Sequence, residues 1–194
     1  IYTTGGTKAI LDKDTTIVKG TSDSTSVLSA NDGSTVEVAS GKQLETNTHT
    51  ALLANNATAN NKGTINSTRE KGIGIYAVNS KAPDSDSNKG GYNTGTITVS
   101  EEGSVGMLGD NSTLINKKVD DTNRGKIVVE AKKSIAMLGT KASNVENQWE
   151  IKLEKDSITK FEDGLIGIAV NGEGSTGSNS GGINIGAYKD TQYS

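Results

Sequence analysis

Three groups of acidic residues and a single histidine are the side chains of this chain best suited to chemistry. The acids occur at Glu101-Glu102, Asp120-Asp121 and Asp84-Ser85-Asp86, and the histidine is His49. Cleavage of a glycan requires two carboxylates that flank the same bond. The acidic groups fall outside the expected strands and do not recur at matched positions in neighbouring repeats, and no serine lies in a nucleophile elbow. The sequence therefore predicts that the protein is not an enzyme.

The segment from Asp84 to Gly95 resembles part of a calcium-binding loop, because Asp84, Asp86 and Asn88 have the required spacing. Lys89 stands where such a loop needs Gly, and Gly95 stands where it needs a bidentate Glu. We therefore predict no metal and no cofactor. Weak calcium binding at this loop is the alternative.

These residues must be positioned by a repeat that occurs five times. Each copy has an Asn followed four residues later by Ile, with Gly between them in four copies and Trp149 in its place in one. The copies begin at Asn61, Asn93, Asn123, Asn147 and Asn179, and their isoleucines are Ile65, Ile97, Ile127, Ile151 and Ile183. A repeat of this length predicts a stacked architecture.

Two further apolar segments complete each copy. Second segments follow four copies, and a third segment fits around Leu114 and Val145. The second segments are Ile73-Gly-Ile75, Val105-Gly-Met107, Ile135-Ala-Met137 and Ile166-Gly-Ile168. Their alternation with period two is typical of strands, and stacked coils share a core that one coil cannot form alone. We predict an all-β parallel β-helix, a solenoid of about six to seven coils with three short strands per coil and loops at the corners.

The regularity of the repeat suggests how the chain is organised. Residues 61–194 are expected to form the regular coils, and residues 1–60 an irregular set of N-terminal coils or a cap. Both parts would belong to one elongated domain. The opening Ile1-Tyr2-Thr3-Thr4, which has neither an initiator Met nor a signal peptide, suggests a fragment of a longer chain.

Composition excludes several classes of partner. The net charge of −3 favours neither nucleic acid nor an anionic membrane. No apolar run is long enough to span a bilayer, so this segment is expected not to be membrane-inserted. The absence of Cys excludes a disulfide framework, so the stack itself must supply the stability.

Loops at the corners are the first candidate binding surface, because loops on a rigid scaffold commonly carry binding residues. The segments 80–92, 117–122 and 172–178 each precede a repeat Asn and are expected on one side of the solenoid. Tolerated surface insertion is the alternative. The candidate residues in these loops are Pro83, Asp84, Asp86, Tyr92, Lys117 and Lys118.

An apolar stripe on the second strands is the second candidate surface. If Ile73, Val105, Ile135 and Ile166 point inward, then Gly74, Gly106, Ala136 and Gly167 face outward. Tyr76, Leu108 and Leu138 would then lie beside them on an exposed face suited to a partner. The alternative is that the chain bends there and buries Leu108 and Leu138.

The segment Asn-x-Gly-x-Ile-x-Val, followed by Ser104–Met107 or Ser134–Met137, resembles the repeats of fusobacterial-type (type V) autotransporter passenger domains. The resemblance covers about residues 31–194. It implies a right-handed β-helix on the bacterial cell surface, anchored to the outer membrane through a C-terminal β-barrel that is absent from this sequence.

The resemblance implies an adhesin. We therefore expect a non-catalytic, monomeric rod whose loops contact a surface protein or glycan of another bacterium or a host cell. The alternatives are a glycan-binding or glycan-cleaving β-helix, as in a lyase or tailspike, and a spacer without a ligand.

Overall fold

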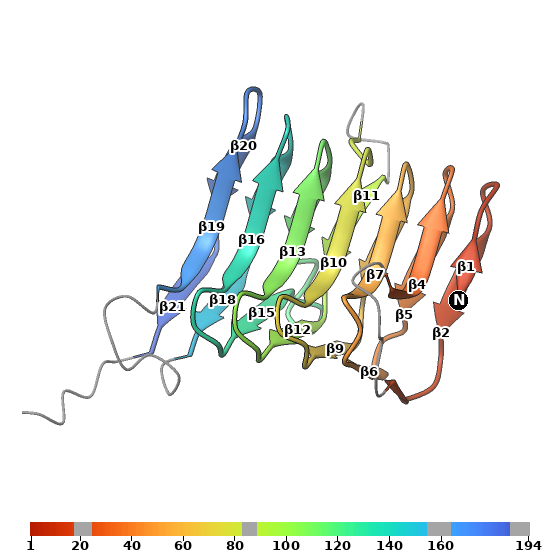
Figure 1. Ribbon diagram of the computed structural model, residues 1–194, viewed down its shortest axis with the longest axis horizontal. Coiled ribbons are helices and arrows are strands. Elements are labelled where there is room, and N and C mark those ends of the chain that lie inside the picture. Colours follow the sequence, from red (N-terminus) through yellow and green to blue (C-terminus); the bar gives the residue numbers. More distant parts are fainter. Residues whose placement is uncertain (18–24, 83–88, 155–163, 187–194) are drawn as a thin grey trace, which may run out of the picture.

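The computed structural model describes residues 1–17, 25–82, 89–154 and 164–186, and strands are its only regular elements. Twenty-one strands form three sheets of seven, and every neighbouring pair within a sheet is parallel (Figure 1). Each coil gives one strand to each sheet in turn, so the chain winds through seven coils. None of the described residues forms a helix that is long and apolar enough to cross a membrane.

We name the three sheets A, B and C in the order in which the chain visits them. Sheet A contains β1 (Tyr2–Thr3), β4 (Ser26–Asn31), β7 (Thr50–Asn55), β10 (Ile73–Val78), β13 (Val105–Asp110), β16 (Ile135–Thr140) and β19 (Ile166–Asn171). Sheet B contains β2 (Lys8–Leu11), β5 (Thr35–Val38), β8 (Thr58–Asn61), β11 (Gly90–Asn93), β14 (Thr113–Asn116), β17 (Asn144–Asn147) and β20 (Thr176–Asn179). Sheet C contains β3 (Thr15–Ile17), β6 (Gln43–Thr46), β9 (Thr64–Ser67), β12 (Thr96–Val99), β15 (Lys126–Val129), β18 (Glu150–Leu153) and β21 (Gly182–Ile185).

The predicted parallel β-helix is confirmed, with three strands per coil. Equivalent isoleucines pair in register from coil to coil along sheet C: Ile65, Ile97, Ile127, Ile151 and Ile183. Four of them are fully buried, and Ile183 in the last coil is 38% exposed. Parallel strands lie about 4.8 Å apart, so these side chains touch along the axis and form a continuous apolar column. Crossover connections between parallel strands are right-handed in nearly all proteins, which agrees with the right-handed β-helix expected for this chain.

A second column, at the corner between sheets B and C, consists of asparagines. The side-chain amide of Asn61 donates to Oδ1 of Asn93 (2.9 Å), and Asn93 donates to Asn116 (2.8 Å). Asn116 donates in the same way to Asn147 (2.7 Å), and Asn147 to Asn179 (2.7 Å). Each buried amide thus has a partner in the next coil, as buried polar groups require.

The prediction that the third copy begins at Asn123, as the others begin at Asn61, Asn93, Asn147 and Asn179, was wrong. Asn116 occupies the position, and Asn123 lies in an exposed loop, where it bonds to Asp120. Residues 117–124 separate Asn116 from Gly125, whereas a single residue separates the Asn from the Gly or Trp149 in the other copies. The loop itself contains an Asn four residues before Ile127, so spacing alone could not separate the two.

Sheet A departs from the predicted alternation. A Cβ added to Gly106 would meet Ile127 of the core, and Ala136 is fully buried, so these positions face inward rather than outward. Met107, the next residue, is also fully buried, so two successive residues face inward. Val105 and Ile135 are correspondingly only half-buried and Ile166 of the last coil is 44% exposed, whereas Ile73 is 5% exposed. The second strands therefore depart from strict alternation at this point, so that the residues predicted to face outward line the core.

The first sixty residues follow the same plan as the rest. The strands β1 to β8 pair in register with their successors and supply buried side chains such as Leu28, Leu44 and Leu52. Within the described residues, coils of three strands continue across the boundary predicted at residue 60. These coils lack the motif because Leu11 and Val38 stand at the corner position that later coils give to Asn.

The loops lie at different corners of the coil. Residues 79–89, of which 83–88 lie outside the described residues, connect sheets A and B, as do residues 172–175. Residues 117–125 connect sheets B and C instead. The expectation that all three loops lie on one side was therefore wrong for residues 117–122. Apolar segments that look alike in the sequence, at Leu114 and at Ile97, belong to different sheets.

Candidate functional site: a charged groove on sheet B

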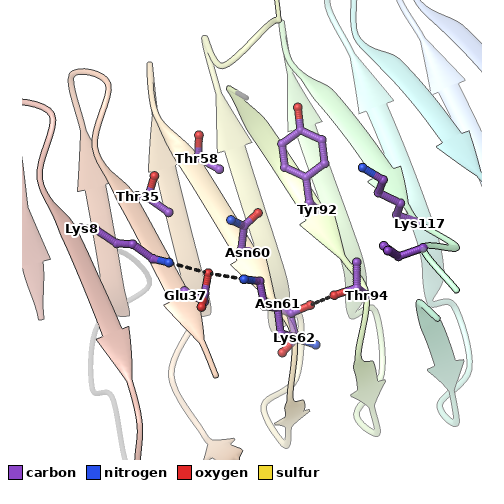
Figure 2. Close-up of a pocket in the computed structure, with 11 residues that line it drawn as sticks. Lys8, Thr35, Glu37, Thr58, Asn60, Asn61, Lys62, Tyr92, Thr94 and Lys117 are labelled. Carbon is purple, nitrogen blue, oxygen red and sulfur yellow. Dashed lines mark hydrogen bonds and ion pairs between the residues drawn. The ribbon is translucent and has the colours of Figure 1, made fainter. Parts of the chain in front are cut away.

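A groove of about 380 Å³ crosses the outer face of sheet B (Figure 2). Its lining side chains come from β2, β5, β8 and β11 and from the start of the 117–125 loop, so the groove runs along the axis across five coils. Four coil steps of about 4.8 Å give it a length of roughly 19 Å. The lining residues are Lys8, Thr35, Glu37, Thr58, Asn60, Asn61, Lys62, Tyr92, Thr94, Lys117 and Val119.

The groove is hollow at this part of sheet B because neighbouring strands there carry small residues. Thr35 of β5 pairs with Thr58 of β8, and Thr58 pairs with Gly90 of β11. Tyr92 rises beside this floor, and its hydroxyl donates to the backbone carbonyl of Lys89 (3.0 Å). A row of short side chains next to a large aromatic one produces a hollow with one apolar wall.

Glu37 lies at one end of the groove and is unusual for an outward-facing residue, because its side chain is only 7% exposed. Its Oε2 contacts the ammonium of Lys8 from the coil before (3.0 Å) and that of Lys62 from the coil after (3.1 Å), as Figure 2 shows. Burial alone would raise the pKa of Glu37, but hydrogen bonds and charge attraction from the two lysines outweigh it and lower the pKa. The carboxylate therefore stays ionised at neutral pH.

Lys117 lies at the other end of the groove. It follows Asn116 as Lys62 follows Asn61, and its backbone amide bonds to Asn93 as that of Lys62 bonds to Val38. Three lysines against one glutamate leave the groove with two excess positive charges, although the whole chain carries −3. The local excess of positive charge favours anionic groups over cationic ones in the groove.

The loop that carries Lys117 is held against the scaffold. Lys118 and Arg124 form a β-bridge, and their charged groups each lie 4.7 Å from the centre of the Trp149 ring. Cation–π contacts at exposed sites contribute about 0.5–1 kcal/mol each, so the two contacts help to hold the loop in place. Trp149 thus lies at the outer corner, between the two cations. Within the loop, Asp120 accepts hydrogen bonds from the side chain and backbone of Asn123 and from Thr122, which lower its pKa.

Two of the predicted binding residues, Tyr92 and Lys117, line the groove. Lys118 lies at the neighbouring corner against Trp149. Tyr76, Leu108 and Leu138 pair with one another on sheet A, a different face, where each is half-buried. The remaining three, Pro83, Asp84 and Asp86, lie outside the described residues.

The acidic groups considered for catalysis do not converge in the described part of the chain. Glu102 lies at the corner between sheets C and A, where it pairs with Lys132 and Lys133. Asp120 and Asp121 lie in the 117–125 loop. The described ranges contain no group of three or more His, Cys, Asp or Glu side chains placed to hold a metal ion.

Sequence reasoning did not identify Lys8, Glu37 and Lys62, which form the most charged part of the groove. Glu37 stands between two buried valines, Val36 and Val38. A lone acid at the outward position of an apolar strand was the available signal. Its two lysines come from other coils, and pairing them required a register for the first sixty residues.

Comparison with known proteins agrees with the fold. Residues 1–182 match the family model of the BigA third pectate lyase-like domain. No curated protein and no solved structure matches the chain. The match covers nearly all the described coils, including the first three. The chain therefore belongs to the family of BigA third pectate lyase-like domains.

Proposed function

We propose that the chain is a non-catalytic segment of a bacterial cell-surface adhesin and that it attaches through the groove on sheet B. The observation that carries this proposal is the groove itself, which joins charged, polar and aromatic side chains from five successive coils. A rigid stack holds these groups at fixed spacing, so several weak contacts can act together along its length. The half-buried row of Tyr76, Leu108 and Leu138 on sheet A offers a further contact surface.

Two similarities support a location on the cell surface. The family name identifies a domain of BigA, and the repeats resemble those of autotransporter passenger domains. We propose that the segment is exposed outside the cell, as a monomer anchored to the outer membrane by another part of its protein. Its partner would be a surface protein or glycan of another bacterium or of a host cell.

The environment of Glu37 supports binding rather than catalysis. A general acid must hold a proton at the working pH, whereas two lysines lower the pKa of Glu37. The acid at the centre of the charged end therefore serves to order Lys8 and Lys62.

Binding to intact epithelial cells and partner bacteria tests the proposal. The double variant Lys62→Ala/Lys117→Ala should weaken attachment by about tenfold or more, since every 1.4 kcal/mol of lost binding energy is a factor of ten. The matched control is Lys132→Ala/Lys133→Ala, which removes two lysines that share Glu102 at another corner. Equal attachment by both variants would contradict a role for the groove.

Glycan cleavage is the second candidate, because the family model describes a pectate lyase-like domain and the groove contains a carboxylate and three lysines. Prolonged incubation with acidic and neutral polysaccharides, followed by measurement of new reducing ends and of unsaturated products, tests it. Turnover that the Glu37→Gln or Lys62→Ala variant abolishes would replace the adhesin proposal with an enzymatic one.

A further inference from the structure

We propose that the groove on sheet B binds a linear anionic glycan in which charged sugars are separated by neutral ones. This inference rests on the proposed function and specifies its ligand. It combines three features of the groove: its direction, the distribution of its charges and the position of its aromatic ring.

The direction of the groove favours a linear polymer. The groove follows the axis of the solenoid rather than the strands, and its lining residues repeat with the coil spacing of about 4.8 Å. A hexose in an extended chain is of similar length. Successive sugars can therefore lie over successive coils, and each sugar meets the outward side chains of one strand.

The lysines of the groove come from every second coil: Lys8 from coil one, Lys62 from coil three and Lys117 from coil five. Lys8 and Lys62 share Glu37 of coil two, which leaves one excess positive charge there, and Lys117 supplies another. Between Lys62 and Lys117 lies a neutral stretch, formed by Tyr92 and Thr94 of coil four. A glycan with an acid on every sugar would place carboxylates over this neutral stretch without a cation, and desolvating them there is unfavourable.

Tyr92 stands in the neutral stretch. It pairs with Asn60 on one side and Ile115 on the other, and the bond from its hydroxyl to Lys89 fixes its tilt. Figure 2 shows its ring rising from the sheet between the Glu37 cluster and Lys117. A fixed aromatic face beside an amide, here that of Asn60, can pack against the apolar face of a neutral sugar and bond its hydroxyls.

Glu37 is a positioning residue in this proposal. Two ammonium groups that share one carboxylate oxygen are held close together despite their mutual repulsion. Both lysine side chains are nearly half exposed, at 46% and 48%, so each ammonium can also reach an anion in the groove.

Calorimetric titration of the full chain with four short probes tests the inference. The probes are an oligosaccharide in which glucuronic acid alternates with N-acetylglucosamine, an oligogalacturonate, a neutral N-acetylglucosamine oligomer and an oligo-glutamate peptide. We expect the alternating probe to bind about tenfold or more tightly than the other three, with affinity that falls as salt rises. Equal or tighter binding of oligogalacturonate, or of the peptide, would overturn it, as would the absence of binding by the alternating probe.

Variants assign the contacts. Lys117→Ala should weaken the alternating probe and leave the neutral oligomer unchanged, whereas Tyr92→Ala should weaken both and Tyr92→Phe should restore binding. Lys132→Ala is the control that should change neither. Glu37→Gln should weaken the alternating probe and leave the neutral oligomer unchanged, whereas a general structural defect would weaken both.

The outcomes separate this inference from the proposed function. If the groove variants lose cell attachment but no glycan probe binds, the ligand assignment fails and the adhesin proposal stands. If the groove variants attach to cells as well as wild type does, the proposal that the chain attaches through the groove fails, whatever the glycan probes show.

Discussion

The first two coils and the last five are joined to their neighbours by different means. In coils one and two the corner between sheets B and C carries Leu11 and Val38, and a carboxylate on the outer face links coils one to three through Lys8 and Lys62. From coil three onward, buried asparagines form a hydrogen-bonded column at the same corner.

The two regions nevertheless keep one register, since Val38 pairs with Asn61 as Asn61 pairs with Asn93. Backbone pairing and the apolar columns therefore set the geometry, and the corner side chains adjust how firmly neighbouring coils are joined. An uncharged buried column should be insensitive to pH, whereas a lysine–glutamate link should not. Three substitutions test this difference.

Interrupting the column should have the largest effect. Asn93→Ala removes a fully buried side chain that accepts from Asn61 and donates to Asn116 and to the carbonyl of Lys126. Each buried group left without a partner costs about 1–3 kcal/mol. We expect the free energy of unfolding, measured by urea denaturation, to fall by roughly 3–5 kcal/mol with little dependence on pH.

Asn123→Ala is the matched control, because Asn123 is an exposed loop residue with the same sequence spacing to Ile127. Its loss should change the unfolding free energy by less than about 0.5 kcal/mol, as for most surface substitutions. If Asn93→Ala and Asn123→Ala lowered the unfolding free energy equally, the asparagine column would not stabilise the fold more than an exposed loop residue does.

Removing the charge of Glu37 should have an intermediate effect that depends on pH. The folded-state pKa lies below the ordinary value of 4.5, so the stabilisation is present above that value and is lost as pH falls through the folded-state pKa. Glu37→Gln should lower the unfolding free energy by roughly 1–2 kcal/mol at pH 7, and the difference from wild type should shrink in acid.

Thermal melts between neutral and acidic pH measure this effect. Glu102→Gln serves as the comparison, since Glu102 also pairs with two lysines but its side chain is 39% exposed. The Glu102 variant should remain close to wild type and its small effect should disappear in high salt. A difference for Glu37→Gln that did not change with pH would mean that the link acts through shape rather than charge.

Extending the column by one coil should have the smallest effect. In Val38→Asn, the new amide can donate to Asn61 just as Asn61 donates to Asn93, so the loss should be below about 1 kcal/mol. Val36→Asn on the same strand has only Ala9 and Ala59 as neighbours in register. That variant should lose about 1–3 kcal/mol, because its amide has no polar partner. Equal losses by urea denaturation would refute the idea that the column can be extended.

The sequence predicted those parts of the fold that depend on a repeated side chain. The isoleucine column followed from a fixed spacing and proved to be in register. The orientation of Val105 and Ile135 did not follow, because it depends on two successive inward-facing positions, as at Gly106 and Met107, that strict alternation does not allow for. The first two coils lacked the corner Asn and so carried no local mark of the solenoid.

The groove was predictable only in part. Tyr92 and Lys117 were selected because they lie in or next to loops, and they form its middle and one end. Lys8, Glu37 and Lys62 come from three coils that are 25 or more residues apart in sequence. Their association depends on the stacking of complete coils, so it could be seen only in the folded chain.

The 117–125 loop leaves its coil after Asn116, a member of the asparagine column, and the chain rejoins the coil at Gly125 without disturbing the pairing of Ile127. A foreign peptide can therefore be grafted at this corner. Strand pairing depends only on the residues where the chain leaves the coil and where it returns, not on the residues between them. An epitope or affinity tag placed after Asn147 or Asn93 would be displayed on the same edge as the natural hairpin. The scaffold can in this way acquire new specificities by insertion alone, with every column of its interior left in place.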